Sequence, residues 1–201
     1  MYNFLTIGFD CSPASALRSL ELRNYALPFD WIESNIKSIE LCFKDNFLKF
    51  HTNLILNTNN TRLMDAYGFQ FPHDYPTVNS NTTNIINENV NIISEDVIID
   101  DWMKFYPDIK EKYNRRIKRF NEIVRDSKPI IILCRYKTQH VIQLKKLFIK
   151  YFNKHNIYFI NAYKEKFDYN GITNIDPEIN NVWNDTEIWK IAINLTTQNI
   201  L

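Results

Sequence analysis

Residues 130–161 read IIILCRYKTQHVIQLKKLFIKYFNKHNIYFIN, and this stretch decides the fold. Residues 130–135 form a nearly uninterrupted apolar run, of the kind that is buried on both faces of a sheet. Residues 138–153 then carry apolar side chains at helical spacing, and residues 157–161 form a second apolar run. A strand, a helix and a strand of these lengths favour two parallel strands joined by the helix. The stretch therefore predicts an α/β fold.

A third strand is predicted near the N-terminus, at residues 3–9, with a helix from Ser12 to about Arg23 behind it. Pro13 suits the first turn of that helix, because the N–H that proline lacks would have no partner there. Ser12 is expected to cap the helix with its hydroxyl. Cys11 then lies where a strand passes into a helix, and open α/β sheets tend to place their sites in such loops.

The remaining elements follow from periodicity and turn signals. An Asn-rich turn at residues 57–61 separates two short apolar segments, which predicts a β-hairpin. Residues 77–91 are polar and Asn-rich and are expected to form a loop. Helices are predicted at residues 32–43, 107–125 and 185–195. We expect a single domain over residues 1–201, with a central, mainly parallel sheet, flanking helices and a β-hairpin insertion.

Composition narrows the class of protein. The 201 residues suit one domain, and a hydrophobic content of 45% excludes general disorder. A net charge of +1 gives no overall reason to expect nucleic acid or an anionic membrane as partner. The N-terminal residues do not resemble a secretory signal, and no apolar run approaches the length of a membrane span. A cytoplasmic protein is therefore expected.

Other compositional features concern cofactors and source. Three scattered cysteines are too few for a disulfide framework or a CxxC metal site, so neither a metal nor an organic cofactor is expected. Asn, Ile and Lys are used heavily, whereas only 3 glycines occur. This bias is typical of AT-rich coding, as in an intracellular parasite, an endosymbiont or a large DNA virus.

Cys11 is the first candidate for chemistry. The free N–H groups and the dipole of a helix N-terminus favour a thiolate, and the same N–H groups can stabilise an oxyanion. The adjacent Asp10 acts against this, because a nearby negative charge raises the pKa of a thiol. Cys11 could equally be a small buried apolar residue. Cys42 and Cys134 lie within apolar elements and are expected in the core.

His73 is the second candidate, because it lies in a stretch that two prolines restrict and could act as general base toward a thiol. Neighbouring side chains in an extended chain point to opposite faces, so Asp74 is poorly placed to orient His73 and is considered for substrate binding instead. Asp30, in the turn after the Cys11 helix, is the freer candidate for a third catalytic residue.

Several arginines could bind an anionic group. The helix at residues 107–125 carries a basic cluster of Arg115, Arg116, Lys118 and Arg119. Arg115, Lys118 and Arg119 share one side of the helix, and the cluster forms either a solvated face or a clamp for a carboxylate or another anion. Arg135 follows the buried strand directly. If that strand and the N-terminal strand are parallel, Arg135 emerges at the same sheet edge as Cys11.

Five segments together carry a family resemblance. They are TIGFDCSPASALRSLELR (6–23), PFDWIES (28–34), FQFPHDY (69–75), YNRRIKRF (113–120) and IIILCR (130–135). In this order they resemble the family of papain-like cysteine peptidases that was formerly a domain of unknown function. The resemblance implies a cysteine-peptidase-like fold, with Cys11 as nucleophile and His73 as base. It also makes Asp30 and the arginines of the long helix site candidates. The Cys-Gly-Ser-Cys-Trp surroundings of papain itself are absent, and no Gln precedes Cys11.

Three hypotheses about function follow. The first is a thiol-dependent hydrolase or acyl transferase that acts on an amide, isopeptide or ester bond of a peptide, protein or acyl substrate through Cys11 and His73. The second is a binding protein or non-peptidase transferase, in which Arg135, the helix arginines and the helix N-terminus hold a phosphorylated or sugar-nucleotide ligand. The third is an interaction module whose site has decayed. The sequence leaves the oligomeric state open.

Overall fold

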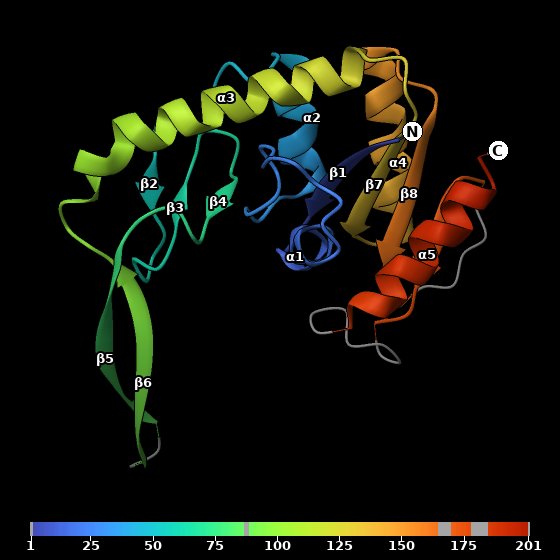
Figure 1. Cartoon of the computed structure of the whole chain (residues 1–201). Coiled ribbons are helices and arrows are strands. Elements are labelled where there is room, and N and C mark those ends of the chain that lie inside the picture. The colour runs from blue at the N-terminus through green and yellow to red at the C-terminus, as the bar shows by residue number, and fades with distance from the viewer. Residues whose placement is uncertain (1, 87–88, 165–169, 178–184, 201) are drawn as a thin grey trace.

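The computed structural model describes residues 2–86, 89–164, 170–177 and 185–200 (Figure 1). Its centre is a four-stranded sheet in the order β1-β7-β8-β9, and every pair in it is parallel. The strands are β1 (Asn3–Gly8), β7 (Ile130–Arg135), β8 (Ile157–Ala162) and β9 (Ile172–Ile175). The prediction of an α/β fold with a parallel sheet is confirmed, although β9 lies in a stretch for which no element was predicted.

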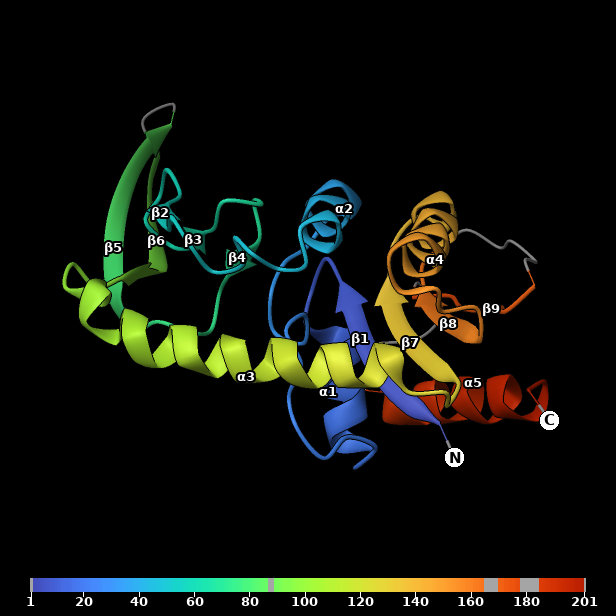
Figure 2. The same ribbon diagram turned by 90° about the horizontal axis from the view of Figure 1, so that it is seen from above.

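Helices cover both faces of the sheet (Figures 1 and 2). The helices are α1 (Ser12–Ser19), α2 (Ile36–Lys44), α3 (Tyr106–Arg125), α4 (Thr138–Phe152) and α5 (Thr186–Gln198), and a short 3-10 helix, η1 (Trp102–Phe105), precedes α3. Alternate side chains of β7 point to opposite faces of the sheet. Ile131 and Leu133 pack with α1 and α5, whereas Ile130 and Ile132 pack with α2, α3 and α4. The apolar run IIILCR is thus buried on both sides, as its sequence predicts.

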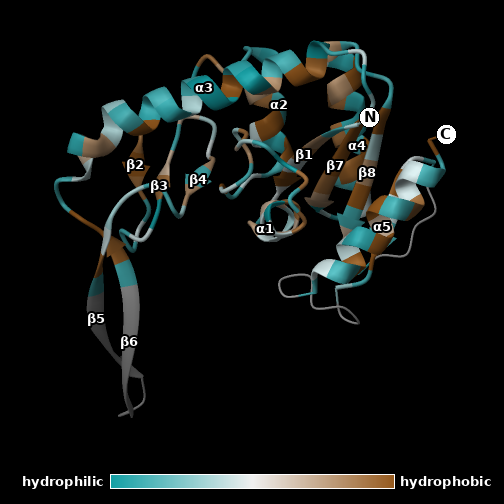
Figure 3. Ribbon diagram, viewed as in Figure 1, coloured by the Kyte–Doolittle hydropathy of each residue, from teal (hydrophilic) through white to brown (hydrophobic). Residues whose placement is uncertain are grey.

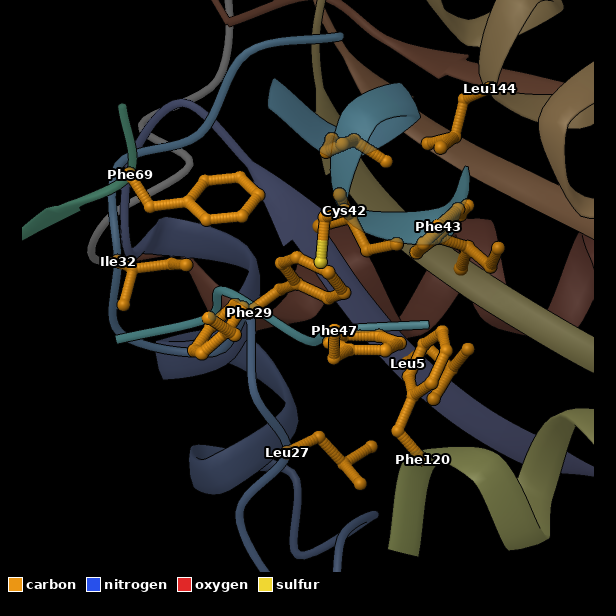
Figure 4. Packing of buried hydrophobic residues seen from close by; sticks show 14 of the residues in the cluster. Leu5, Leu27, Phe29, Ile32, Cys42, Phe43, Phe47, Phe69, Phe120 and Leu144 are labelled. Atoms are coloured by element: carbon orange, nitrogen blue, oxygen red, sulfur yellow. The ribbon is translucent and has the colours of Figure 1, made fainter. Parts of the chain in front are cut away.

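The larger core is strongly aromatic. Phe29, which follows α1 in the chain, contacts the rings of five other phenylalanines with centroid distances between 5.7 and 6.0 Å. These rings come from α2, the loop behind it, the segment before β4 and α3, namely from Phe43, Phe47, Phe50, Phe69 and Phe120. Figure 4 shows Phe29 among four of these rings, those of Phe43, Phe47, Phe69 and Phe120. In Figure 3 the central strands β1 and β7 are largely brown, or hydrophobic, whereas much of α3 is teal, or hydrophilic.

A smaller antiparallel sheet lies beside the main one. It contains β2 (Ile55–Leu56), β3 (Leu63–Met64) and β4 (Gln70–Phe71). The main-chain N–H of Asn57 donates to the carbonyl of Arg62 at 2.9 Å and closes the Asn-rich turn. The predicted β-hairpin is therefore confirmed, and a third short strand extends it to the segment that carries His73.

The prediction of a loop at residues 77–91 is wrong. Strands β5 (Thr77–Ile86) and β6 (Asn89–Ile98) pair antiparallel along their whole length and project from the body as a ribbon (Figure 1). Residues 87–88 of the expected loop lie outside the described residues. The strands pair through their facing main-chain groups, and water can satisfy the outward ones in a projecting ribbon, so the pair needs no apolar face toward the core. A polar, Asn-rich composition gives no signal for such a pairing.

Two helix boundaries differ from prediction for local reasons. Helix α1 stops at Ser19 and not at Arg23, because Glu21 adopts a left-handed conformation with φ of 55°. Helix α2 begins at Ile36 and not at Ile32, because Asn35 caps it by accepting the N–H of Ser38 at 3.0 Å. The residues before that cap are extended, and Glu33 bridges to Gln70 of β4.

Among the described residues, no helix is long and apolar enough to cross a membrane.

The aromatic core makes a prediction about stability. Phe29→Ala removes a ring that is 2% exposed and leaves a cavity among its five aromatic neighbours. We expect a loss of about 3–5 kcal/mol in the free energy of unfolding, measured by urea denaturation. Leu48→Ala is the control, because Leu48 is 74% exposed and its truncation should change stability by no more than about 0.5 kcal/mol. Equal losses for both variants would contradict the assignment of Phe29 to the centre of the core.

Candidate active site

The parallel pairing of β1 and β7 brings the first two candidate residues to one edge. Gly8 is the register partner of Arg135, so both strands end side by side at their carboxyl ends. Cys11 follows three residues after the end of β1, at the start of α1. This is the arrangement that the sequence predicts if the two strands are parallel.

Cys11 itself occupies the N-cap position of α1, with φ of −88° and ψ of −1°. Ser12, which was expected to cap the helix, is instead its first residue and is fully buried. The carboxylate of Asp10 does the capping, because it accepts the main-chain N–H of Ser12 at 2.9 Å and the Ser12 hydroxyl at 2.7 Å. Pro13 lies in the first turn, as predicted. The thiol of Cys11 thus stands at a helix N-terminus, 6% exposed.

His73 approaches this thiol from the segment that follows β4. Its Nε2 lies 3.4 Å from Sγ of Cys11, although the two residues are 62 positions apart in the chain. The imidazole is exposed, so the open side of the pair faces solvent. The ring of Trp31 contacts the imidazole nearly perpendicularly, with a centroid distance of 6.4 Å. Two residues selected from sequence for one reaction are thereby brought within contact distance.

The segment around His73 is fixed by its neighbours. The carboxylate of Asp74 accepts hydrogen bonds from Lys112 and from the Tyr113 hydroxyl, both on α3, and its side chain is only 5% exposed. On the next residue, the Tyr75 hydroxyl lies 3.1 Å from Nε2 of the buried His51. Asp74 therefore points away from the open side of the dyad and anchors the main chain that carries His73.

The pKa of Cys11 is raised to about 11. Burial is the largest cause, followed by the negative charges of Asp10 and Glu33, whereas the positive charge of Arg62 acts in the opposite direction. Burial removes water that would solvate a thiolate, so it favours the neutral form. From the sequence, the helix N-terminus was expected to lower the pKa of this thiol and Asp10 to raise it. In the structure the effects that raise the pKa are larger, so the neutral thiol is favoured.

The structure does not bring Asp30 to His73. Asp30 is 3% exposed and accepts hydrogen bonds from the Thr6 hydroxyl at 2.6 Å, the Leu27 N–H at 2.8 Å and Arg23 at 2.6 Å. Burial raises the pKa of this carboxyl, and the hydrogen bonds and arginines act against that shift. Within the described ranges, none of its hydrogen bonds reaches the imidazole. The carboxylate joins β1 to the turn after α1.

Arg135 reaches the same edge as Cys11 but already has a partner. Its guanidinium donates to the Asp10 carboxylate at 2.6 Å and lies 5.0 Å from the centroid of the Phe9 ring. An anionic ligand was hypothesised between Arg135 and the N-terminus of α1. In the structure the carboxylate of Asp10 occupies this place.

The three arginines of α3 have different surroundings. Arg115 pairs with Glu111 on the exposed side of the helix. Arg116 lies over the Tyr113 ring at 5.1 Å, and its Nη1 is buried without a hydrogen-bond partner in the structure. Arg119 lies over the Tyr25 ring at 5.0 Å. The predicted grouping therefore splits, and Arg116 and Arg119 face the loop behind α1 whereas Arg115 does not.

Sequence reasoning missed Trp31, Glu33 and Arg62. Glu33 and Arg62 both act on the pKa of the Cys11 thiol, and they lie 3.6 Å apart as an ion pair. The ring of Trp31 contacts His73. The segment PFDWIES that carries the resemblance contains both Trp31 and Glu33, and this was the signal that could have selected them.

In the part of the chain that the structure describes, no cluster of three or more His, Cys, Asp or Glu side chains could hold a metal ion.

Comparison with known proteins identifies one relative and a family. The relative is "Uncharacterized protein R408" of Acanthamoeba polyphaga mimivirus, with 27% identity over 152 residues. The match covers 65% of this chain and 60% of that viral protein, so the chain spans about three fifths of the relative's length. No solved structure matches the chain. A family model described as "Putative papain-like cysteine peptidase" matches residues 2–161, which include Cys11, His73 and Arg135. The chain therefore belongs to this family of papain-like cysteine peptidases.

Proposed function

We propose that the protein is a thiol-dependent hydrolase or acyl transferase that acts on an amide, isopeptide or ester bond through Cys11 and His73. The observation that carries the proposal is the 3.4 Å approach of the Cys11 sulfur to Nε2 of His73. Membership of a peptidase-like family supports a peptide or protein as the substrate. A nucleophile at a helix N-terminus beside a general base is the arrangement that acyl transfer requires.

The raised pKa of Cys11 determines how the proposed reaction starts. At neutral pH the thiol is protonated, so His73 removes its proton while the sulfur attacks the carbonyl carbon. The tetrahedral intermediate then expels the amine or alcohol, which takes the proton back from His73 and leaves a thioester on Cys11. Water attacks this thioester in a hydrolase, and a second amine or alcohol attacks it in a transferase. His73 accepts the proton of that second nucleophile, and the thiol is restored.

Charge on the carbonyl oxygen needs a donor in the proposed intermediate. The N–H groups at the start of α1 were expected to stabilise this oxyanion, but the N–H of Ser12 already donates to Asp10. We therefore assign this role to the Cys11 N–H together with Arg62, whose positive charge lowers the pKa of Cys11 and thus acts on charge at this site. The guanidinium has five N–H donors, so it can serve the oxyanion beside its ion pair with Glu33.

The carboxylates take positioning and structural roles in this proposal. Asp74 positions His73 through the main chain, because its own contacts go to Lys112 and Tyr113. Asp30 holds β1 to the turn that carries Trp31. The alternative of an anionic ligand at the sheet edge receives less support, because the Asp10 carboxylate already pairs with Arg135 there.

The first test of the function is acylation of the thiol by p-nitrophenyl acetate. We expect a burst of p-nitrophenol and an acetyl group on Cys11, located by peptide mass spectrometry, and neither in Cys11→Ala. His73→Gln should slow acylation by roughly 10²- to 10⁴-fold, because it removes the general base. His155→Gln is the matched control, since His155 is also exposed but bonds to Asn153 away from the site. Equal acylation rates in wild type and His73→Gln would refute the dyad.

The second test concerns the charges around the thiol. The rate of Cys11 alkylation by iodoacetamide should still be rising above pH 10, because the folded protein has a pKa of about 11 at this residue. Glu33→Gln removes a negative charge, so the apparent pKa should fall, whereas Arg62→Gln removes a positive charge and should raise it. The two variants lie in one ion pair and act as controls for each other. Shifts in the same direction would contradict the electrostatic assignment.

The third test concerns the anchor of His73. Asp74→Asn should slow acylation of Cys11 by roughly 10- to 100-fold, because a small displacement of the base is costly. The negative charge of Asp74 raises the pKa of Cys11, so its removal should make the thiol slightly more acidic at the same time. A slower reaction from a more acidic thiol is the signature of a positioning role. A change in rate that merely follows the thiol pKa would contradict it.

A further inference from the structure

A group of arginines lies beside the dyad, and the proposed reaction does not use it. We define this arginine cluster as Arg23, Arg116 and Arg119. Arg23 comes from the loop behind α1, and its guanidinium lies 5.1 Å from the centroid of the Trp31 ring. Arg116 and Arg119 come from α3, where they lie over Tyr113 and over Tyr25 of the same loop. Two distant parts of the chain thus bring cations to one place.

The charge of this cluster is incompletely balanced. Asp30 is the carboxylate that pairs with Arg23, and the positive charge of Arg116 also acts on it. Asp74, which follows β4 and contacts α3, is already bonded to Lys112 and Tyr113 of that helix. In the described part of the chain, the buried Asp30 carboxylate therefore interacts with two of the three guanidinium groups, those of Arg23 and Arg116.

Arg116 carries a donor without an acceptor. Its Nη1 is buried and has no hydrogen-bond partner in the structure. A buried N–H donor on a charged group is unfavourable unless an acceptor reaches it. An anionic group of a ligand would supply that acceptor, and a planar guanidinium suits a carboxylate especially well.

The position of Trp31 relates the cluster to the reaction. The Trp31 ring contacts the His73 imidazole at 6.4 Å and the Arg23 guanidinium at 5.1 Å. In the proposed mechanism His73 returns the proton to the leaving amine, so the part of the substrate beside His73 is the amine part. Arg23 contacts the same Trp31 ring that contacts His73. An anion bound at Arg23 would thus belong to the leaving group of the substrate and not to its acyl group.

We propose that Arg23, Arg116 and Arg119 bind a carboxylate on the amine side of the scissile bond. The substrates are then peptides or peptide conjugates whose leaving part ends in, or carries, a carboxylate close to the cleaved bond. This inference rests on the proposed function, because it is His73 that identifies the amine side. Arg115 is not part of the site, since it pairs with Glu111 on the exposed side of α3.

The test measures binding in the Cys11→Ser protein, so it does not depend on catalysis. The probes are N-acetyl-triglycine, its C-terminal amide, and the amide of N-acetyl-Gly-Glu-Gly, titrated by NMR with the indole N–H of Trp31 as reporter. We expect triglycine with the free carboxylate to bind about tenfold more tightly than its amide, as charge-assisted hydrogen bonds favour the ionised group. The glutamate peptide distinguishes a side-chain carboxylate from a terminal one.

Variants then locate the preference. Arg116→Gln and Arg119→Gln should each reduce the preference for the carboxylate, whereas Arg115→Gln should retain it. Arg23 is left unchanged, because its loss would leave the buried carboxylate of Asp30 without its ion-pair partner. Equal binding of carboxylate and amide probes, or a preference that survives in both variants, would overturn the proposal. Tighter binding of inorganic phosphate than of either carboxylate peptide would also overturn it, in favour of a phosphate ligand.

The two proposals can fail separately. If p-nitrophenyl acetate leaves Cys11 unmodified while the carboxylate preference persists and depends on Arg116, the acyl-transfer function is refuted and the arginine cluster remains a carboxylate site. If Cys11 is acylated with dependence on His73 but the peptides show no preference, the cluster assignment is refuted and the function stands.

Discussion

The parallel pairing of β1 with β7 is the constraint on which the rest of the structure depends. Its register joins Gly8 to Arg135 and ends both strands at one edge. A shift of one residue would turn every side chain of a strand to the opposite face, and here both faces are buried against helices. The register also sets the contact between Arg135 and Asp10, whose carboxylate caps α1. The location of Cys11 thus follows from how two buried strands align.

The location of His73 depends on a different part of the fold, the docking of α3. Asp74 is bonded to Lys112 and Tyr113 on that helix, and Phe120 of the same helix packs against both Phe29 and Phe43 in the aromatic core. The two halves of the dyad are therefore carried by separate frameworks, the parallel sheet and the long helix. The aromatic core holds the frameworks together, so packing far from the thiol contributes to the 3.4 Å approach of sulfur and nitrogen.

Local sequence signals were sufficient to predict the helices and strands that bury an apolar face. The run at residues 130–135, the amphipathic helix α3 and the strand before Cys11 all appear as periodicity or apolarity implies. The junction of strand and helix indicated Cys11 as a candidate, and the proline-restricted segment indicated His73. The structure brings the two side chains within 3.4 Å, and their catalytic role stays a prediction. The sequence could not predict the ribbon of β5 and β6, because two strands that pair mainly with each other need no hydrophobic pattern.

The roles of individual polar groups were the least predictable feature. Asp30, Asp74 and Arg135 were selected as chemically useful, but each is bonded to a partner that only the folded chain supplies. The same holds for the state of the thiol, since burial and the distant Glu33 decide it together with Asp10.

The neutral state of Cys11 also bears on how long the protein stays intact. Peroxide attacks thiolates, and the first step of the oxidation ladder is therefore slow for a protonated sulfur that is 6% exposed. Cys42 and Cys134 are fully buried, which protects them by exclusion. In the proposed mechanism, a resting molecule with a neutral thiol is therefore expected to react more slowly with oxidants than an enzyme with a preformed thiolate, because its sulfur would lose the proton only when His73 accepts it during the reaction.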